Sequence, residues 1–292
     1  MTTISELARA KVNLTLRVLG RRPDGYHELE SLIVFADVGD ELHLEPGGPV
    51  GIRVTGPFGA SITGPNLVAT ALSRLAEAEP RLVLGSVTLD KRLPVAAGIG
   101  GGSADAGALL RAVRRANPAL AGSIDWTGIA AKLGADVPVC LASAPALVWG
   151  AGEKMTMLAG VPPLAAVLVN PLIPVPPDKT ARVFANLSAP PVAPGRAPPL
   201  VSPTRIQTPE GLVDFMRSQG NDLAAAATAV MPDIAHVQAR MALCQGCMAT
   251  CLSGAGPTVF GVFPGPEEAR SAAAALRESH PEWWVMPAIL GP

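Results

Sequence analysis

The 292-residue sequence lacks the features that mark several large classes of protein. Its 23 basic and 24 acidic residues leave a formal net charge of −1, and aromatic residues make up only 4% of the chain. Without a basic surface or many stacking rings, binding to a nucleic acid is not expected. No apolar run approaches the roughly 20 residues that cross a bilayer, so a membrane is not an expected partner either. We therefore expect a globular protein with a small-molecule partner.

The first residues, MTTISELARAKVNL, have no apolar core of the kind found in secretion signals. This start is interpreted as mature sequence, and a cytoplasmic location is predicted.

Cysteine is scarce, with four in the chain. Cys244, Cys247 and Cys251 are spaced at i, i+3 and i+7, a pattern that fits a metal site or one stripe of a helix. No fourth cysteine lies nearby, and His236 is the only close imidazole. The spacing therefore favours small side chains packed on a helix, with no metal site and no disulfide in a reducing compartment.

The order of the predicted elements indicates α+β organisation in two domains, residues 1–155 and 156–292. The alternating segment 8–18 predicts a strand with one buried face. Further predicted strands are 32–35, 41–44, 51–54, 86–90, 137–141, 146–149, 164–169 and 283–286. The predicted helices are 66–78, about 103–116, 126–133, 211–218, 222–230, 234–244 and 267–278. Strands and helices do not alternate regularly, so a doubly wound sheet is not predicted.

A proline-rich segment interrupts the second domain. Seven prolines lie between Pro190 and Pro209. Regular structure is not expected there, and an extended surface loop is predicted.

The most informative pattern is the run LPVAAGIGGGSADAGALL, which has four glycines within the five residues Gly98–Gly102. A predicted strand enters this run, and a helix is expected to open at Ser103. Glycines let a ligand approach the backbone closely, and a helix N-terminus presents unpaired N–H groups. The run therefore predicts a polyphosphate site, in which Ser103 would cap the helix, bind phosphate or reach Mg²⁺. A glycine-rich turn without a ligand is the alternative.

Two familiar nucleotide-binding motifs do not fit this run. A dinucleotide-binding fingerprint that starts at Gly98 needs a glycine at position 103, which is serine. A Walker A loop needs Gly-Lys, and that pair occurs nowhere in the chain.

Three polar residues outside the loop are candidates for chemistry. Lys11 and Asn13 fall on the same face of the first strand, about 6.5–7 Å apart, where they could hold a phosphate and a substrate oxygen. The pattern alone favours a solvated strand face. Asp136, in KLGADVPVCL, could deprotonate a hydroxyl nucleophile, or it could be an ordinary turn carboxylate.

Tyr26, the single tyrosine, and His27 follow a predicted turn. A ring and an imidazole on one loop can stack on a heterocyclic base and hydrogen-bond its edge, although local packing of the tyrosine is the simpler alternative. The segment SGAGPTVF forms a second glycine turn. It would either connect two elements tightly or close over the phosphates.

Together these segments resemble the GHMP kinases, whose three motifs match ARAKVNLTLRVLGRRPDGYHEL, LPVAAGIGGGSADA and LSGAGPTVFGVF in this order. With KRLP and LGADVPV, the combination is similar to the members that phosphorylate the 2-hydroxyl of a cytidine diphosphate-linked methylerythritol, on the non-mevalonate route to isoprenoid precursors. The resemblance covers nearly the whole chain and is weakest between about 185 and 210. It implies a ribosomal protein S5 domain 2-like N-terminal domain and a ferredoxin-like C-terminal domain, with the site between them.

The resemblance also assigns roles to residues. It implies ATP and Mg²⁺, with an N-terminal domain that binds ATP and a C-terminal domain that binds substrate. Lys11 and Asp136 would be the catalytic pair, Asp136 acting as the base. The residues expected at the nucleotide are Asn66, Pro94, Val95, Ala96, Ala97, Gly98, Ile99, Gly100, Gly101, Gly102, Ser103 and Ala104. The residues expected at the alcohol substrate are Asn13, Tyr26, His27 and Thr180, with Tyr26 and His27 at the cytosine.

The sequence departs from the family pattern at a few positions. Ala104 stands where the family usually has a second serine, so one phosphate or metal contact is missing or comes from the backbone. Ala96 and Ala97 replace glycines found in some members. The segment VPPDKTARVF is longer than expected before Thr180.

Two rival functions remain at this stage. One is a GHMP kinase for another small alcohol, which the Tyr26–His27 pair disfavours. The other is a ligand sensor with this fold and no turnover, which the presence of both Lys11 and Asp136 disfavours.

Overall fold

The computed structural model describes residues 2–192 and 206–291. Contacts group the chain into two compact units, neither of which is contiguous in sequence. The first unit comprises residues 1–11, 38–95 and 100–143, and the second comprises 12–37, 96–99 and 144–292. Strands β1 (Ile4–Asn13) and β3 (His27–Pro46) therefore contribute to both units. The predicted boundary between residues 155 and 156 stays a prediction.

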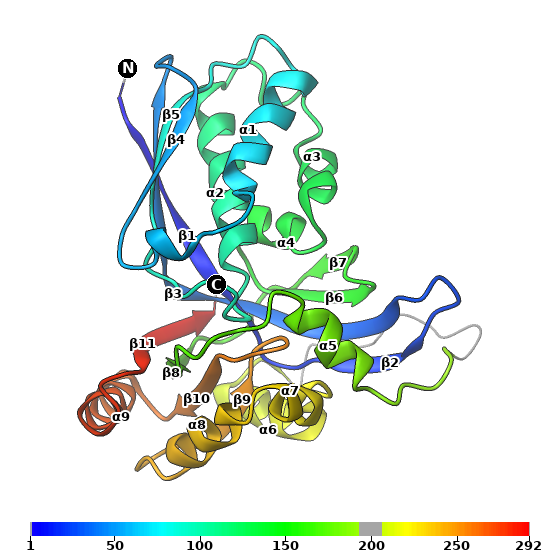
Figure 1. Cartoon of the computed structure of the whole chain (residues 1–292), viewed down its shortest axis with the longest axis vertical. Coiled ribbons are helices and arrows are strands. Elements are labelled where there is room, and N and C mark those ends of the chain that lie inside the picture. The colour runs from blue at the N-terminus through cyan, green and yellow to red at the C-terminus, as the bar shows by residue number, and fades with distance from the viewer. Residues whose placement is uncertain (1, 193–205, 292) are drawn as a thin grey trace. The chain divides into compact units, whose positions relative to one another are not determined.

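The first unit packs four helices against a small sheet. Within it, β5 (Gly85–Asp90) pairs in parallel with β4 (Gly51–Thr55) and antiparallel with the later part of β3. The helices are α1 (Leu67–Ala78), α2 (Gly101–Ala116), α3 (Trp126–Leu133) and α4 (Val137–Ala142), and η1 (Gly59–Ser61) is a short 3-10 helix. Figure 1 shows α1 to α4 gathered on one side of these strands.

The prediction of a strand at 137–141 is wrong, because these residues form α4. Pro138 lies in the first turn, where its fixed φ suits a helix and its missing N–H costs nothing. The helix packs closely on α2, since a Cβ at Gly107 would lie 2.7 Å from the backbone carbonyl of Cys140. A short apolar run of this kind is ambiguous in sequence, and the tertiary contact with α2 decides in favour of the helix.

The second unit is built on antiparallel strands. Strand β8 (Leu164–Asn170) is buried along its whole length, between β10 (Val259–Phe263) and β11 (Trp284–Gly291), and β9 (Ala249–Leu252) pairs with β10. The first part of β3 pairs with β2 (Arg17–Arg21) and β6 (Ala146–Gly150), and β6 also pairs with β7 (Lys154–Met157).

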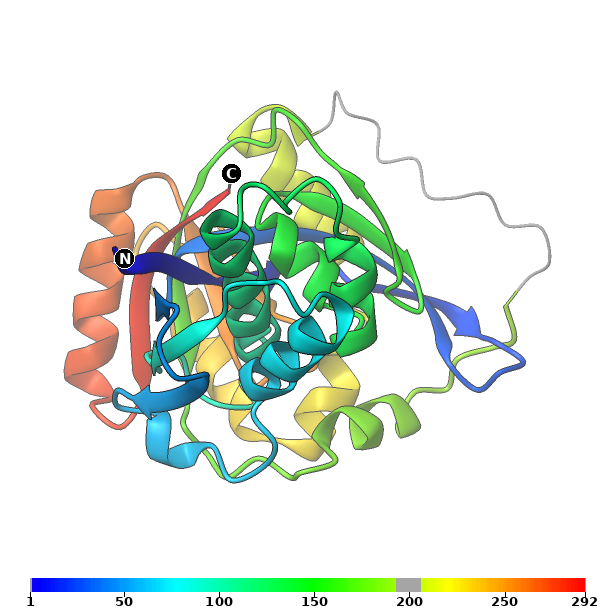
Figure 2. The same ribbon diagram turned by 90° about the horizontal axis from the view of Figure 1, so that it is seen from above.

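Five helices complete the described part of this unit: α5 (Lys179–Ala185), α6 (Pro209–Gln219), α7 (Ala224–Val230), α8 (Asp233–Ala242) and α9 (Pro266–Ser279). Helix α8 packs on β9 and β10, and α9 packs on β8, β10 and β11. Figure 2 shows α9 lying along β11.

The structure also corrects the reading of the cysteines. Helix α8 ends at Ala242, so Cys244 and Cys247 lie in the turn that follows it and Cys251 lies on β9. Their regular spacing therefore does not mark a helical stripe. Within residues 2–192 and 206–291, no group of three or more metal-ligating side chains comes together. Over the same ranges, none of the helices is both long enough and apolar enough to span a bilayer.

Most other predicted elements are present, but several were missed. Strands β7 and β9 and helix α5 were not predicted. The single strand predicted at 8–18 is divided, because β1 ends at Asn13 and β2 begins at Arg17. Helix α2 begins at Gly101, two residues earlier than expected, with Gly100 as its N-cap. Ser103 is thus the third residue of the helix, and the prediction that it caps the helix is wrong. The proline-rich loop predicted at 190–209 lies largely outside the described residues.

Candidate active site

Lys11 and Asp136 form an ion pair within the first unit. The Lys11 Nζ lies 2.9 Å from Asp136 Oδ2, with the lysine side chain 7% exposed and the carboxylate 45% exposed. Lys11 comes from β1, whereas Asp136 is the N-cap residue of α4 and makes no capping hydrogen bond with its side chain. The carboxylate is thus free to meet solvent or a ligand while the ammonium beside it is buried.

The polar face of the first strand is not solvated, contrary to the simpler sequence interpretation. Lys11, Asn13 and Thr15 are only 6%, 4% and 3% exposed. Asn13 Nδ2 donates to Ser31 Oγ at 2.7 Å, and Ser31 Oγ donates onward to the Thr15 carbonyl. Asn13 Oδ1 is left buried with no partner among the described residues. An unpartnered buried acceptor suits a ligand hydroxyl, because leaving it unpaired is costly.

The start of α2 presents unpaired backbone donors in the first unit. Ala104 makes the first backbone hydrogen bond of the helix, because its N–H donates to the Gly100 carbonyl at 2.8 Å. The N–H groups of residues 101–103 precede it and belong to the unsatisfied first turn. A Cβ at Gly102 would meet no heavy atom within 4 Å, so this turn borders open space. The arrangement suits an anion.

A buried charge cluster lies beneath this turn. Lys91, at the end of β5, donates to Asp105 at 2.7 Å and also to Asp40, and all three side chains are at most 4% exposed. Burial acts to lower the pKa of Lys91, but the charges of Asp105 and Asp40 and their hydrogen bonds outweigh it and raise the pKa. Burial also raises the pKa of Asp105. A Cβ at Gly101 would lie 3.5 Å from Lys91 Nζ, so the cluster supports the turn directly.

The rest of the glycine-rich run, residues 96–99, packs within the second unit on the loop 253–258. Thr258 N donates to the Ala97 carbonyl, and Ser253 Oγ donates to the Gly98 carbonyl, each at 3.0 Å. Gly98 has φ +81°, and a Cβ there would lie 2.6 Å from the carbonyl oxygens of Ser253 and Gly256. Glycine is required at this position by both its conformation and the close approach. The second glycine turn thus packs on the first and is hydrogen-bonded to it. Its two predicted roles, a tight connection or closure over the phosphates, stay predictions.

Ala96, which replaces a glycine of the family pattern, has φ +56°. This left-handed conformation is uncommon for alanine. Its carbonyl accepts a hydrogen bond from Lys179 Nζ at 2.9 Å, and the same ammonium donates to the Gly256 carbonyl. Lys179 is 6% exposed, and burial lowers its pKa to about 8. It therefore connects both glycine loops through their carbonyl groups.

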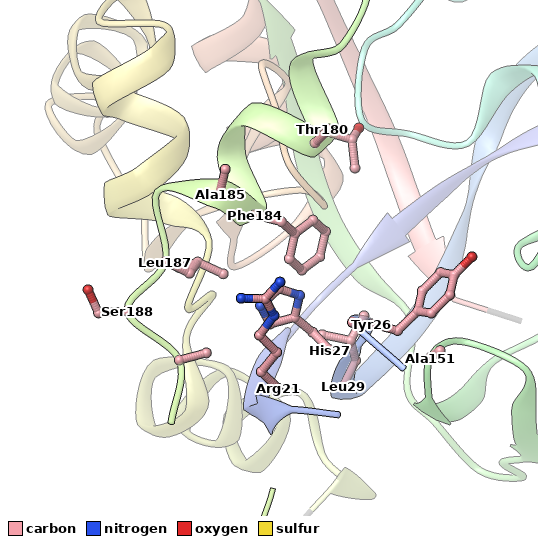
Figure 3. Close-up of a pocket in the computed structure, with 13 residues that line it drawn as sticks. Arg21, Tyr26, His27, Leu29, Ala151, Thr180, Phe184, Ala185, Leu187 and Ser188 are labelled. Carbon is pink, nitrogen blue, oxygen red and sulfur yellow. The ribbon is translucent and has the colours of Figure 1, made fainter. Parts of the chain in front are cut away.

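A cavity of about 740 Å³ in the second unit is lined by three of the predicted substrate residues, Tyr26, His27 and Thr180. Phe184, which like Thr180 belongs to α5, also lines it. Figure 3 shows the ring of Phe184 facing His27, with Thr180 further along the same helix. The rings of His27 and Phe184 are stacked, with centroids 4.9 Å apart and an angle of 27° between them. Tyr26 is 66% exposed, so most of its ring is available to a ligand.

Two further features of this cavity suit a polar heterocycle. Burial, and to a smaller extent the charge of Arg21, lowers the pKa of His27. The imidazole is therefore neutral at physiological pH, when it offers one donor and one acceptor. Leu29 and Leu187 add apolar surface. Arg21 also lines the cavity and places a guanidinium beside His27. Aromatic and apolar walls with a neutral imidazole suit a planar ring, and the guanidinium adds a hydrogen-bond donor beside it.

Asn66 has a clear structural task. Its side chain caps α1 by accepting a hydrogen bond from Val68 N at 2.9 Å. This uses one of the two acceptor sites of its carbonyl oxygen and leaves the Nδ2 group available to a nucleotide. The nucleotide roles of Asn66 and of residues 94–104 stay predictions.

Sequence reasoning missed Phe184 and Lys179 because it did not predict α5. In VPPDKTARVF, Phe184 stands four residues after Thr180, the spacing that places two side chains on one face of a helix. That spacing was the available signal for Phe184. For Lys179 there was none, since nothing in the sequence indicates that this lysine is buried.

Two family models match parts of this chain, and curated relatives match nearly all of it. The model "GHMP kinases N terminal domain" matches residues 66–144, and the model "GHMP kinases C terminal" matches residues 207–282. A 4-diphosphocytidyl-2-C-methyl-D-erythritol kinase of Rhodopseudomonas palustris (strain BisA53) is 44% identical, over 98% of this chain and 97% of the relative. The protein of that name from Parvibaculum lavamentivorans is 43% identical, over 97% and 96%.

Solved structures give the same result. A crystal structure of 4-(cytidine 5'-diphospho)-2C-methyl-D-erythritol kinase matches with a TM-score of 0.77 and 35% identity, over 99% of this chain and 100% of that one. A homoserine kinase from Cytophaga hutchinsonii matches with a TM-score of 0.68 and 18% identity, over 99% and 95%. The second likeness concerns the fold alone.

Proposed function

Because the chain belongs to the family of 4-diphosphocytidyl-2-C-methyl-D-erythritol kinases within the GHMP kinases, we propose that it transfers the γ-phosphate of ATP to the 2-hydroxyl of that cytidylated alcohol. The reaction belongs to the non-mevalonate route to isoprenoid precursors. The observation that carries the proposal is the pairing of the buried Lys11 ammonium with the half-exposed Asp136 carboxylate at 2.9 Å. We further propose that the enzyme acts in the cytoplasm, where ATP is available.

Asp136 is the proposed base. Its carboxylate takes the proton of the 2-hydroxyl as the hydroxyl oxygen attacks the γ-phosphorus. The bond from that phosphorus to the bridging oxygen breaks, and ADP leaves with the electron pair. Lys11 keeps the carboxylate in place and balances the negative charge on the attacking oxygen, and Asn13 Oδ1 accepts a hydrogen bond from the alcohol. Positioning and electrostatic stabilisation dominate this kind of transfer.

The ATP phosphates are assigned to the backbone donors at the start of α2. The open space at Gly102 and the unsatisfied first turn support this assignment. Mg²⁺ would neutralise the β- and γ-phosphates, and in such sites it needs only one or two protein oxygens beside the phosphates. The Ser103 hydroxyl, in that same turn, fits this modest requirement. Ala104 lacks the usual second hydroxyl, and its own N–H bonds to the Gly100 carbonyl, so the N–H groups of residues 101–103 take over that contact.

An ADP-release assay tests the reaction. The panel is the cytidylated alcohol, methylerythritol 4-phosphate, free methylerythritol, homoserine and mevalonate. We expect turnover of the cytidylated alcohol to exceed that of all the others. Comparable turnover of an uncytidylated alcohol would indicate a kinase of other specificity, and no turnover of any would indicate the ligand sensor.

Tyr26→Ala tests the cytosine contact by itself. Stacking of a base on an aromatic ring contributes about 1–3 kcal/mol. The KM for the cytidylated alcohol should therefore rise roughly 5- to 150-fold, with the KM for ATP unchanged. Tyr26→Phe keeps the ring and should leave both values near those of the wild type. If the KM for the alcohol is unchanged in Tyr26→Ala, the cytosine does not bind in this cavity.

A further inference from the structure

Lys179 is a buried lysine that makes no ion pair with any residue of 2–192 and 206–291. Among the described residues its ammonium donates only to two backbone carbonyls, those of Ala96 and Gly256. The nearest acidic neighbour in sequence, Asp178, is instead paired with Arg182 at 2.8 Å. An ammonium has three N–H donors, so one remains beyond these two bonds.

A second, smaller cavity lies at this ammonium. It measures about 340 Å³ and is lined by Ala96 and residues 176–181, which include Lys179 and also Asp178, whose carboxylate is paired with Arg182. Thr180 and Ala181 line both this cavity and the larger one that holds Tyr26 and His27. A ligand with a base in the larger cavity and a tail passing Thr180 therefore reaches the surroundings of Lys179.

We propose that Lys179 is the anion-binding residue for the diphosphate of the cytidylated alcohol. The inference rests on the proposed function, because the base in the larger cavity fixes the direction of the tail. A diphosphate there supplies the negative charge that the protein itself does not place beside Lys179. The shared lining with the Tyr26–His27 cavity favours the diphosphate of the alcohol over the phosphates of ATP. Lys179 also keeps Ala96 in its left-handed conformation, so one side chain serves both the ligand and the loop.

Calorimetric binding of CDP, cytidine and a non-hydrolysable ATP analogue tests the proposal without relying on turnover. The wild type should bind CDP more tightly than cytidine. In Lys179→Met, CDP binding should weaken about 10- to 100-fold, the usual effect of one lost charge-assisted hydrogen bond. Binding of cytidine and of the ATP analogue should stay within about twofold. Lys154→Met, which replaces an exposed lysine on β7, is the matched control and should bind all three ligands as the wild type does.

Proton uptake gives an independent readout. At pH 8, close to the pKa of Lys179, about half of the lysine is neutral, and a bound diphosphate favours its charged form. CDP binding to the wild type should therefore take up about 0.5 proton at pH 8, measured in two buffers of different ionisation enthalpy. Lys179→Gln retains a donor group without the charge, and it should show neither this uptake nor the preference for CDP. If Lys179→Met does not fold, Lys179→Gln replaces it in the binding experiments.

Three outcomes would overturn the proposal. Equal losses for CDP and cytidine would make Lys179 only a support of the loops. A loss confined to the ATP analogue would assign it to ATP. If the wild type binds neither CDP nor cytidine, the proposed substrate fails together with the inference, whereas the first two outcomes leave that substrate intact.

Discussion

Lys91 in the first unit and Lys179 in the second are both buried lysines, but their neighbours differ in charge. Lys91 donates to two carboxylates, Asp40 and Asp105, and its pKa is raised. Lys179 donates to two backbone carbonyls, and burial lowers its pKa to about 8. A buried charge is costly unless it is compensated. The first lysine is compensated by the fold, whereas the second is left for a ligand to compensate.

Lys11 lies between these two cases. Its partner Asp136 compensates the charge but stays half exposed, and so remains accessible to a substrate. The three lysines thus differ in what compensates their charge. For Lys91 it is two buried carboxylates, which support the fold, and for Lys11 it is a half-exposed carboxylate, which is available for chemistry. For Lys179 it is a ligand. Replacing each group in turn tests these three roles.

The largest effect is expected on stability when the compensated lysine is removed. Lys91→Met leaves two buried carboxylates without a counter-charge, which should cost about 3–5 kcal/mol of unfolding free energy. Lys179→Met should change stability by no more than about 1–2 kcal/mol, because relief of a buried charge opposes the loss of two hydrogen bonds. Urea unfolding followed by circular dichroism measures both. Equal costs would erase the distinction between the two lysines.

The next effect is on catalysis and concerns the partly exposed partner. Asp136→Asn keeps the shape of the side chain but removes the base, so kcat should fall about 10²-fold or more. ATP affinity should stay close to that of the wild type, whereas the unfolding free energy should fall by about 1–3 kcal/mol, because the buried Lys11 ammonium loses its counter-charge. As a matched control, Asp178→Asn removes the carboxylate of an exposed pair and should alter stability by less than about 1 kcal/mol. A variant at Asp136 that keeps most of its kcat would exclude this residue from the chemistry.

Much of this fold follows from local sequence signals such as helix caps. The burial of the three lysines does not, because it depends on tertiary contacts. Helix α3 has its predicted bounds because Asp125 caps its start by accepting a hydrogen bond from Gly128 N, and Gly134 follows its end. Helix α1 begins after Asn66 for the same kind of reason. The apolar run that forms α4 carries no such signal, and its packing on α2 decides its structure.

Burial of polar residues is harder to predict than the elements themselves. Lys11 and Asn13 were identified as candidates by their spacing, but their burial comes from tertiary contacts that a single strand does not reveal. Lys179 and Phe184 belong to a helix preceded by prolines, which read as irregular structure. Their importance depends on carbonyl groups and a ring contributed by distant segments.

A smaller effect is expected at two glycines of the run. Gly98→Ala brings a Cβ to 2.6 Å from the Gly256 carbonyl, which is also an acceptor of Lys179, and it strains a positive φ. Its expected cost is about 1–3 kcal/mol of stability. Gly102→Ala meets no protein atom within 4 Å, so it should weaken ATP binding while stability is unchanged or slightly raised. Thermal unfolding and calorimetry with an ATP analogue separate the two. Unchanged ATP affinity in Gly102→Ala would place the phosphates elsewhere.

The smallest effect concerns pH. The pKa of Lys179 is about 8 in the folded protein, below its ordinary value of 10.5, so between these values the unfolded chain binds more protons than the folded one. Folded stability therefore rises with pH in this window. The difference in unfolding free energy, wild type minus Lys179→Met, should become more favourable to the wild type by about 1 kcal/mol from pH 7 to pH 9. A difference independent of pH would mean that Lys179 carries an ordinary charge.

The central claim is the transfer of one phosphate to one hydroxyl, and analysis of the product tests it most directly. The enzyme is incubated with ATP and the cytidylated alcohol, and the products are examined by phosphorus NMR and mass spectrometry. We expect one ADP for each alcohol consumed, one new phosphomonoester on the 2-hydroxyl, and an intact cytidine diphosphate group. ADP formed without a new phosphoester, or a phosphate on another hydroxyl, would contradict the account.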